Sequence, residues 1–172
     1  RALFLDRDGV ICEALPRGKH IVFRHQIRLM PGICDLINQA KKRKHLVIVI
    51  SNQPQIAQGL VSEREVIAIN KYIVELLRGE VDEVYYCPHD ESNGCFCRKP
   101  KSGLILRAIK NHNIDTPNSL FLGDSWRDVI AGQAVGCRTI FIRNQYNESE
   151  LKKCLPDFVV DSLAEAQEIV NM

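Results

Sequence analysis

The sequence predicts an α/β fold in which helices cover both faces of a central, mainly parallel sheet. Short apolar runs that fit buried strands alternate along the chain with segments whose apolar residues recur at helical spacing. This alternation is typical of a three-layer arrangement in which helices connect parallel strands. The expected strands are 2–5, 46–50, 84–86, 120–122, 139–142 and, more weakly, 158–160.

Helical patterns fill the intervals between these runs. Residues 31–44 begin with Pro31, which suits a first helical position, and end in a basic run that suits a helix carboxyl terminus. A second helix should begin at Ser62, because Ser62 and Glu65 have capping-box spacing, and Gly79 can end it. Its apolar stripe, expected to be core, is Val66, Ile69, Ile73 and Leu76. Further helices are expected at 102–111, 127–135 and 163–170.

Length and charge narrow the class of protein. The 172 residues fit one domain, 1–172, and 45% hydrophobic against 26% charged residues is ordinary globular composition. The formal net charge of +2 does not favour a nucleic-acid or membrane surface. No apolar run approaches the roughly 20 residues of a membrane span. We expect a cytoplasmic monomer without nucleic-acid or membrane partners; further domains before residue 1 or after residue 172 stay open.

Polar groups follow the ends of the expected strands, where ligands bind in open α/β sheets. They are D-R-D-G at 6–9, S-N-Q at 51–53 and G-D-S-W-R-D at 123–128, and R-K-P at 98–100 follows a cysteine-rich segment. Each group alone fits a turn or a helix cap. Together they would bring three carboxylates, a hydroxyl and a lysine to one edge of the sheet. Repulsion among the carboxylates then requires a cation.

Magnesium suits this set of groups, because it prefers oxygen ligands and is typically held by one or two carboxylates together with substrate phosphate. Phosphate is therefore the expected substrate group. A carboxylate can attack phosphorus to form an acyl phosphate, which water then hydrolyses. The metal, Lys99 and backbone amides would neutralise charge on the transferring group.

Four motifs in this order resemble the haloacid dehalogenase (HAD) phosphatase superfamily: D-R-D-G-V at 6–10, S-N-Q at 51–53, C-R-K-P at 97–100 and G-D-S-W-R-D at 123–128. The resemblance implies the Rossmann-like fold of that superfamily. It also implies that Asp6 is the nucleophile and that Asp8 protonates the leaving oxygen and then acts as base toward water.

The same resemblance implies the ligands of Mg²⁺ and phosphate. Asp6, the backbone carbonyl of Asp8 and Asp124 would hold Mg²⁺, and Asp128 would support metal-bound waters. Ser51 and Lys99 match the phosphate-binding pair. Two neighbours are further candidates for substrate contact: Asn52 and Arg98, the latter with a solvated surface arginine as the alternative.

A second metal site is expected in the loop 87–97. Cys87, His89, Cys95 and Cys97 supply the donor set of a closed tetrahedral zinc site. Four protein ligands leave no open coordination position, which favours a structural Zn²⁺ that orders the loop. The alternative is a set of free thiols. The odd total of seven cysteines also favours metal in a reducing compartment over disulfides.

The C-P-H and C-x-C-R-K-P elements resemble the branch of the superfamily that contains heptose-1,7-bisphosphate and histidinol-phosphate phosphatases, compact enzymes without a large cap domain. Only residues 12–30 and the zinc loop could then cover the site. Residues 51–59, S-N-Q-P-Q-I-A-Q-G, are more similar to the heptose pattern, from which they differ at Pro54, Gln55 and Gln58.

The resemblance therefore implies a phosphatase acting on a sugar phosphate, with heptose 1,7-bisphosphate as the leading substrate and histidinol phosphate as the alternative. An outer phosphate would meet Arg98 and one of three cations in the first loop: Arg17, Lys19 or Arg24. The balanced charge disfavours a nucleic-acid 3′-phosphatase. A zinc-stabilised binding module with a decayed active site is the alternative of another class, disfavoured by the intact Asp6, Asp8, Lys99 and Asp124.

Overall fold

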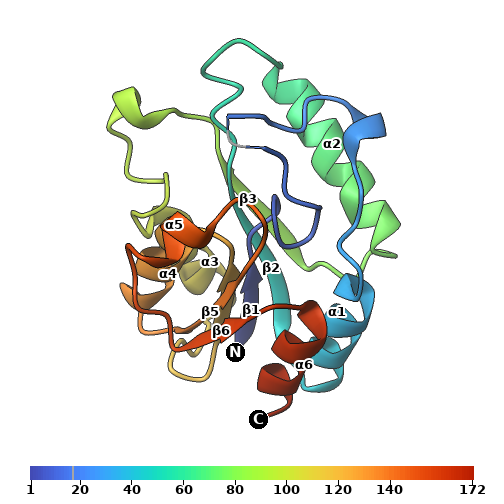
Figure 1. Ribbon diagram of the computed structural model, residues 1–172, viewed down its shortest axis with the longest axis vertical. Coiled ribbons are helices and arrows are strands. Elements are labelled where there is room, and N and C mark those ends of the chain that lie inside the picture. The colour runs from blue at the N-terminus through green and yellow to red at the C-terminus, as the bar shows by residue number, and fades with distance from the viewer. Residues whose placement is uncertain (17) are drawn as a thin grey trace.

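The computed structural model describes residues 1–16 and 18–172. Within them, six strands form one sheet in which every neighbouring pair is parallel, in the order β3-β2-β1-β4-β5-β6 (Figure 1). The strands are β1 (Ala2–Leu5), β2 (Leu46–Asn52), β3 (Glu83–Cys87), β4 (Leu120–Gly123), β5 (Arg138–Ile142) and β6 (Phe158–Val160). The predicted α/β class is thereby confirmed.

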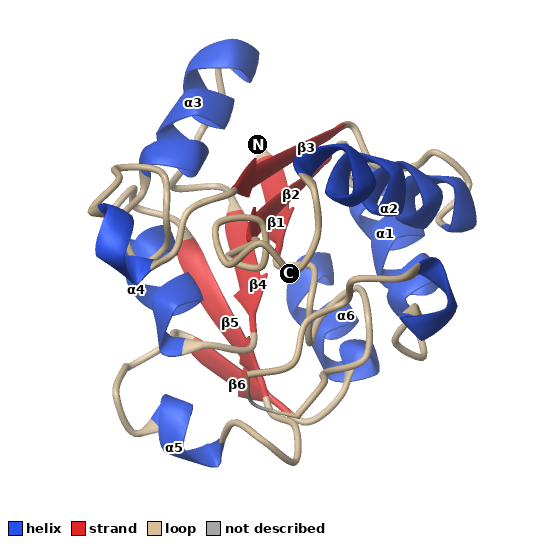
Figure 2. Cartoon of the chain, turned by 90° about the horizontal axis from the view of Figure 1, so that it is seen from above, coloured by secondary structure: helices blue, strands red, loops and turns tan. Residues whose placement is uncertain are grey.

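The helices form the outer layers. They are α1 (Ile33–Lys42), α2 (Glu63–Leu76), α3 (Gly103–His112), α4 (Trp126–Gln133), α5 (Glu148–Leu151) and α6 (Leu163–Asn171), with 3₁₀ turns η1 (Arg24–Gln26) and η2 (Glu91–Asn93). Figure 2 shows α1, α2 and α6 on one side of the sheet and α3 and α4 on the other. None of the helices in the described part of the chain has the length and apolarity needed to cross a bilayer.

Two hydrophobic cores lie on the two faces of the sheet. Side chains alternate between the faces of a strand, so in β1 Leu3 and Leu5 join one core while Ala2 and Phe4 join the other. Helices α1, α2 and α6 supply buried residues to the first core, and α3 and α4 supply them to the second. All four side chains of β1 are therefore buried, which explains its unbroken apolar sequence.

Two details of the predicted helices are wrong. Helix α1 begins at Ile33 rather than Pro31, because Gly32 adopts a left-handed conformation at its N-cap (φ 87°) and leaves Pro31 in the preceding turn. In α2 the predicted capping box is present, with Ser62 Oγ accepting from the Glu65 amide at 3.2 Å. Its core stripe, however, passes from Ile73 to Leu77, one full turn on, so that Leu77 is buried and Leu76 is 38% exposed.

Among the residues that the structure describes, the connections at the carboxyl edge of the sheet carry no large cap. Residues 6–32, between β1 and α1, contain η1 among their described positions, and residues 88–102, between β3 and α3, contain η2. Residues 53–62, between β2 and α2, contain turns. The site at this edge is therefore bordered by short segments, as predicted.

Candidate active site and cysteine–histidine cluster

Three carboxylates meet at the carboxyl edge of the sheet. Asp6 directly follows β1, Asp124 directly follows β4, and Asp128 lies in the first turn of α4. One oxygen from each lies within 4.8 Å of the others. Two glycines permit this approach: a Cβ on Gly9 would lie 2.1 Å from Asp124 Oδ2, and one on Gly123 would lie 2.2 Å from Asp128 Cβ. The first and fourth motifs thus both need glycine, because the acids of the fourth motif lie against these two positions.

This crowding opposes ionisation of the acids. Burial is the main cause that raises the pKa of Asp6 to about 7; Lys99 opposes the rise, and the charges of Asp128 and Asp8 add to it. Burial also raises the pKa of Asp124 well above its usual value, with Asp6 and Asp128 contributing. A cluster of oxygen donors that repel one another fits a hard divalent cation, which would supply the missing positive charge.

Lys99 lies buried between two of these acids. Its Nζ is 2.9 Å from Asp6 Oδ1 and 2.6 Å from Asp128 Oδ1, and it donates a hydrogen bond of 2.6 Å to the Ile50 carbonyl. Burial alone would lower the pKa of the Lys99 ammonium, but the charges of Asp128 and Asp6 raise it to about 12. Lys99 is therefore a fixed positive charge beside Asp6.

Ser51 and Asn52 end β2, directly after Ile50, whose carbonyl accepts from Lys99 Nζ. Asn52 accepts from the Lys99 amide and donates to the Lys99 carbonyl, both at 3.0 Å. Its amide thus anchors the backbone of Lys99, while substrate contact by Asn52 stays a prediction. Ser51 is buried, and its Oγ accepts a hydrogen bond of 2.6 Å from Gln53 Nε2.

The Asp8 carboxylate is paired with its neighbour Arg7. Arg7 Nε donates to Asp8 Oδ1 at 3.0 Å and Arg7 Nη2 donates to Asp8 Oδ2 at 2.8 Å. Arg7 is 1% exposed, whereas the side chain of Asp8 retains 34% of its exposure. Arg7 was not predicted as part of the site, because an arginine between two aspartates in a sequence gives no sign of being buried.

A cleft of about 250 Å³ opens over these residues. Six of the site residues predicted from the sequence line it: Asp6, Asp8, Asn52, Arg98, Lys99 and Asp128. The cleft is also lined by His20, Pro54, Ser125 and Arg127. An adjoining cleft of about 390 Å³ shares His20, Ser125 and Arg127 and is lined also by Asp124. His20 comes from the first loop, which has no periodic pattern that could have identified it. The joined clefts provide space for a ligand that extends beyond one phosphate.

The cations predicted for an outer phosphate differ in placement. Arg98 lines the cleft; its Nη1 donates to the His89 carbonyl at 3.1 Å, and its buried Nε has no acceptor among the described residues. Arg24 instead lies 5.3 Å from the centre of the Tyr72 ring, against α2. Lys19 is exposed in the first loop, and Arg17 lies outside the described residues. Arg98 is therefore the best placed of these cations.

Arg127 is a further cation at the cleft that sequence reasoning missed. Its Nη2 donates to Glu91 Oε1 in η2, and its guanidinium lies 4.9 Å from the centre of the Trp126 ring. The contact with Glu91 joins the fourth motif to the cysteine-rich loop, 36 residues earlier in the chain. This proximity is a product of the fold and leaves no local trace in the sequence.

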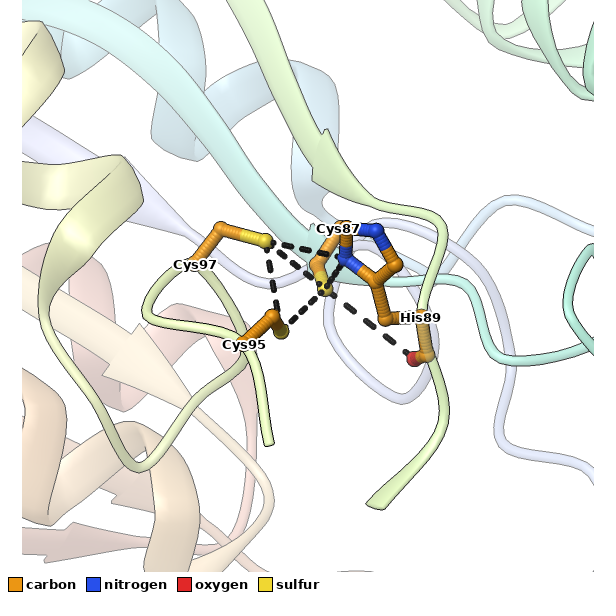
Figure 3. A group of neighbouring side chains, drawn as sticks. All are labelled: Cys87, His89, Cys95 and Cys97. Atoms are coloured by element: carbon orange, nitrogen blue, oxygen red, sulfur yellow. Dashed lines mark hydrogen bonds between the residues drawn. The ribbon is translucent and has the colours of Figure 1, made fainter. Parts of the chain in front are cut away.

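The four predicted zinc donors converge in one group, as Figure 3 shows. The sulfur atoms of Cys87, Cys95 and Cys97 lie 3.2–3.6 Å apart, and His89 Nδ1 lies 3.5 Å from Cys87 Sγ and 3.3 Å from Cys97 Sγ. These separations are too long for disulfides of about 2.05 Å. They approach the edge of about 3.8 Å in a tetrahedron with metal–sulfur bonds of about 2.3 Å. The donor set and its spacing fit zinc.

Hydrogen bonding also favours a thiolate in this cluster. Although burial opposes ionisation of Cys95, hydrogen bonds from Cys97, from the Arg98 amide and from Cys87 lower its pKa to about 7. Burial raises the pKa of Cys87, which is the innermost of the three cysteines. A metal ion would favour the thiolate form of each of them.

Known proteins resemble this chain in sequence and in fold. The HAD-hydrolase-like family model matches residues 96–166. The D-glycero-β-D-manno-heptose-1,7-bisphosphate 7-phosphatase of Pasteurella multocida is 32% identical over 99% of this chain and 97% of its own length. The D-glycero-α-D-manno-heptose-1,7-bisphosphate 7-phosphatase of Campylobacter jejuni is 34% identical over 84% of this chain and 83% of its own.

A solved structure supports the same relationship. The D,D-heptose 1,7-bisphosphate phosphatase of B. bronchiseptica, complexed with magnesium and phosphate, superimposes with a TM-score of 0.89 at 26% identity over 99% of this chain and 98% of its own. The parallel sheet and the acids at its carboxyl edge define the class, a haloacid dehalogenase-type hydrolase. Within that class, the chain belongs to the family of the heptose-1,7-bisphosphate 7-phosphatases.

Proposed function

We propose that this chain is a magnesium-dependent phosphatase that removes one phosphate from D-glycero-D-manno-heptose 1,7-bisphosphate through an aspartyl-phosphate on Asp6. The observation that carries the proposal is the placement of Asp6 at the floor of a cleft, 2.9 Å from the buried ammonium of Lys99 and beside Asp124 and Asp128. The names of the relatives support the substrate, and the magnesium and phosphate in the B. bronchiseptica enzyme support the chemistry. We assign this activity to one domain spanning residues 1–172, acting in the cytoplasm.

In the first half of the reaction, Asp6 attacks the phosphorus atom of the substrate. A bond forms between an Asp6 oxygen and phosphorus, the bond from phosphorus to the leaving oxygen breaks, and Asp8 gives that oxygen a proton. Lys99 stabilises the charge on the transferring phosphoryl group. Magnesium, held by Asp6, Asp124 and the Asp8 carbonyl with Asp128 in support, would neutralise further charge there when bound.

In the second half, a water molecule attacks the phosphorus of the acyl phosphate. Asp8 accepts a proton from that water, and the bond between phosphorus and Asp6 breaks. Orthophosphate leaves, and both aspartates return to their starting states. The overall reaction consumes one water molecule and needs no other reactant.

A phosphate-release screen tests the proposal. The purified protein with Mg²⁺ should release phosphate from heptose 1,7-bisphosphate with a higher kcat/KM than from heptose monophosphates or histidinol phosphate, and should stop after one phosphate per sugar. A preference for histidinol phosphate would assign the chain to that alternative substrate. The absence of turnover on every phosphate ester, including an aryl phosphate, would contradict enzymatic function and favour the binding-module alternative.

Arg98→Ala should narrow the preference for the bisphosphate over a monophosphate. Arg98 lines the cleft, where its guanidinium can meet an outer phosphate, and remote contacts of this kind orient the reacting group. We expect kcat/KM to fall about 10- to 100-fold for the bisphosphate, as for loss of a charge-assisted hydrogen bond, and to change much less for the monophosphate. Arg107→Ala on α3, where Arg107 stacks on Tyr85, is the matched control. An equal loss for both sugars would remove Arg98 from outer-phosphate recognition.

We further propose that Cys87, His89, Cys95 and Cys97 hold a structural Zn²⁺. Elemental analysis should find about one zinc per chain, and Cys97→Ser should lose zinc and lower the thermal midpoint, because the loop then loses its cross-link. Cys34→Ser, an exposed cysteine of α1, is the control and should change neither quantity. Removal of Mg²⁺ should stop activity reversibly with zinc retained, since oxygen and thiolate sites prefer different metals. A wild-type protein that contains no zinc and is fully stable would refute the assignment of a structural zinc site separate from the magnesium site.

A further inference from the structure

The Asp8 carboxylate is held on its inner side by two side chains that the proposed reaction does not use. Arg7 binds both of its oxygens, at 3.0 and 2.8 Å, and Gln53 Nε2 approaches Oδ2 at 3.3 Å. Arg7 is 1% exposed and Gln53 is fully buried, whereas the Asp8 side chain keeps 34% of its exposure and lines the cleft. The carboxyl group is thus fixed from behind and open toward a ligand.

Arg7 and Gln53 are each fixed by a hydrogen bond to a further side chain, and these two bonds lead to different parts of the fold. Arg7 Nη1 donates to Asn70 Oδ1 of α2 at 2.9 Å. Gln53 Oε1 accepts from Gln55 Nε2, and that nitrogen also reaches the Ile21 carbonyl of the first loop at 3.5 Å. A continuous chain of polar contacts therefore connects α2 and the first loop to Asp8.

A contribution to stability alone is a poor explanation for this series of polar contacts. Arg7 is the largest fully buried side chain in the described part of the molecule, and a buried charge is costly even when it is paired. An apolar residue of similar volume would fill the same space without that cost. A planar guanidinium, however, fixes the orientation of a carboxylate through two parallel hydrogen bonds, which an apolar side chain or a lysine cannot do.

We propose that Arg7 and Gln53 are positioning residues that orient the Asp8 carboxyl for proton transfer to the leaving oxygen. The inference rests on the proposed function, which assigns that transfer to Asp8. A general acid must lie within hydrogen-bond reach of the oxygen it protonates, and a displacement of about 1 Å can cost on the order of 10²-fold in rate. Gln55 extends the support to the first loop, so that the loop and the acid are fixed together.

Leaving-group dependence distinguishes this role from a merely structural one. An alkyl oxygen, as in a sugar phosphate, needs a proton in order to leave, whereas p-nitrophenolate leaves without one. The value of kcat/KM should be measured for heptose 1,7-bisphosphate and for p-nitrophenyl phosphate. We expect Arg7→Lys and Gln53→Ala each to lower it about 10- to 100-fold for the sugar and less than about threefold for the aryl ester.

A double-mutant cycle with Asp8→Asn supplies the second readout. Asp8→Asn alone should lower kcat/KM selectively for the sugar, and neither Arg7→Lys nor Gln53→Ala should lower it further in that background, because both act through Asp8. Ile73→Val is the control: Ile73 lies in the same core beside Arg7 and Asn70 without a polar contact to Asp8. Ile73→Val should reduce the stability of the protein and leave the ratio of the kcat/KM values for the two esters unchanged.

The possible outcomes separate this inference from the proposed function. Equal losses on both esters, or losses that add to those of Asp8→Asn, would overturn the positioning role while the phosphatase assignment survives. An Asp8→Asn variant that does not distinguish the esters would overturn the positioning role together with the assignment of proton transfer to Asp8. A wild-type protein that hydrolyses neither ester would overturn the proposed function itself. Circular dichroism identifies a variant that fails to fold; Arg7→Lys, which keeps the buried charge, and Gln53→Ala provide independent tests.

Discussion

Asp6→Asn should abolish turnover while the fold and the zinc site remain. The amide has the shape of the carboxylate, and its oxygen can keep both contacts of Asp6 Oδ1, with the Arg7 amide at 2.7 Å and with Lys99 Nζ at 2.9 Å. What it loses is the charged nucleophile, so kcat should fall on the order of 10³-fold or more. Phosphate release by the purified variant, measured against wild-type protein, checks this expectation.

The same variant should be at least as stable as the wild type when Mg²⁺ is absent. Removing one charge relieves repulsion of Asp6 with Asp128 and Asp124, each of which opposes ionisation of its neighbours. A stability gain with lost activity is the trade-off expected of an active-site acid. Asp35→Asn, the same change on exposed α1, is the control for both measurements. Substantial turnover by Asp6→Asn would exclude Asp6 as nucleophile.

Lys99→Met should produce the largest combined loss of activity and stability. Methionine fills similar space, but it leaves Asp6 and Asp128 without the ammonium that lies 2.9 and 2.6 Å away. Removing one partner of a buried ion pair typically costs about 3–5 kcal/mol of unfolding free energy. Loss of a charge that stabilises the transition state should lower kcat on the order of 10²- to 10³-fold.

Urea unfolding and phosphate-release kinetics measure these two effects. Lys110→Met, an exposed lysine in the last turn of α3, should be nearly neutral in both assays. Saturating Mg²⁺ should recover part of the stability lost in Lys99→Met, since the metal ion adds positive charge beside the same carboxylates. A variant with normal stability and turnover would show that the Lys99 ion pairs contribute to neither.

The fold and the main acids could be predicted because both depend on local patterns. Unbroken apolar runs identify buried parallel strands, and the residues after them must meet at one edge of the sheet, which is where Asp6 and Asp124 lie. The zinc donors lie within 11 positions, 87–97, so their proximity follows from the short loop. Helix α5 was not predicted, because its four residues are too few to show a helical period.

The unpredicted features depend on contacts between distant parts of the chain. Asn52 is predicted to contact substrate from its place after the expected strand 46–50, and its contact with the backbone of Lys99, 47 residues later, could not be predicted. The burial of Arg7 depends on Asn70 of α2, 63 residues away. Sequence periodicity reports which face of an element is buried, and it carries no information on which polar group another element will bring to that face.

The combination of Asp6, Asp124 and Asp128 with Lys99 has a thermodynamic consequence. Fully ionised, these four groups carry three negative charges and one positive charge, so a phosphate dianion would meet net repulsion unless a divalent cation were present. Cation and anion should therefore bind cooperatively, each lowering the dissociation constant of the other by the same factor. Orthophosphate, the product, shares this linkage, so product inhibition should weaken as the concentration of free Mg²⁺ falls.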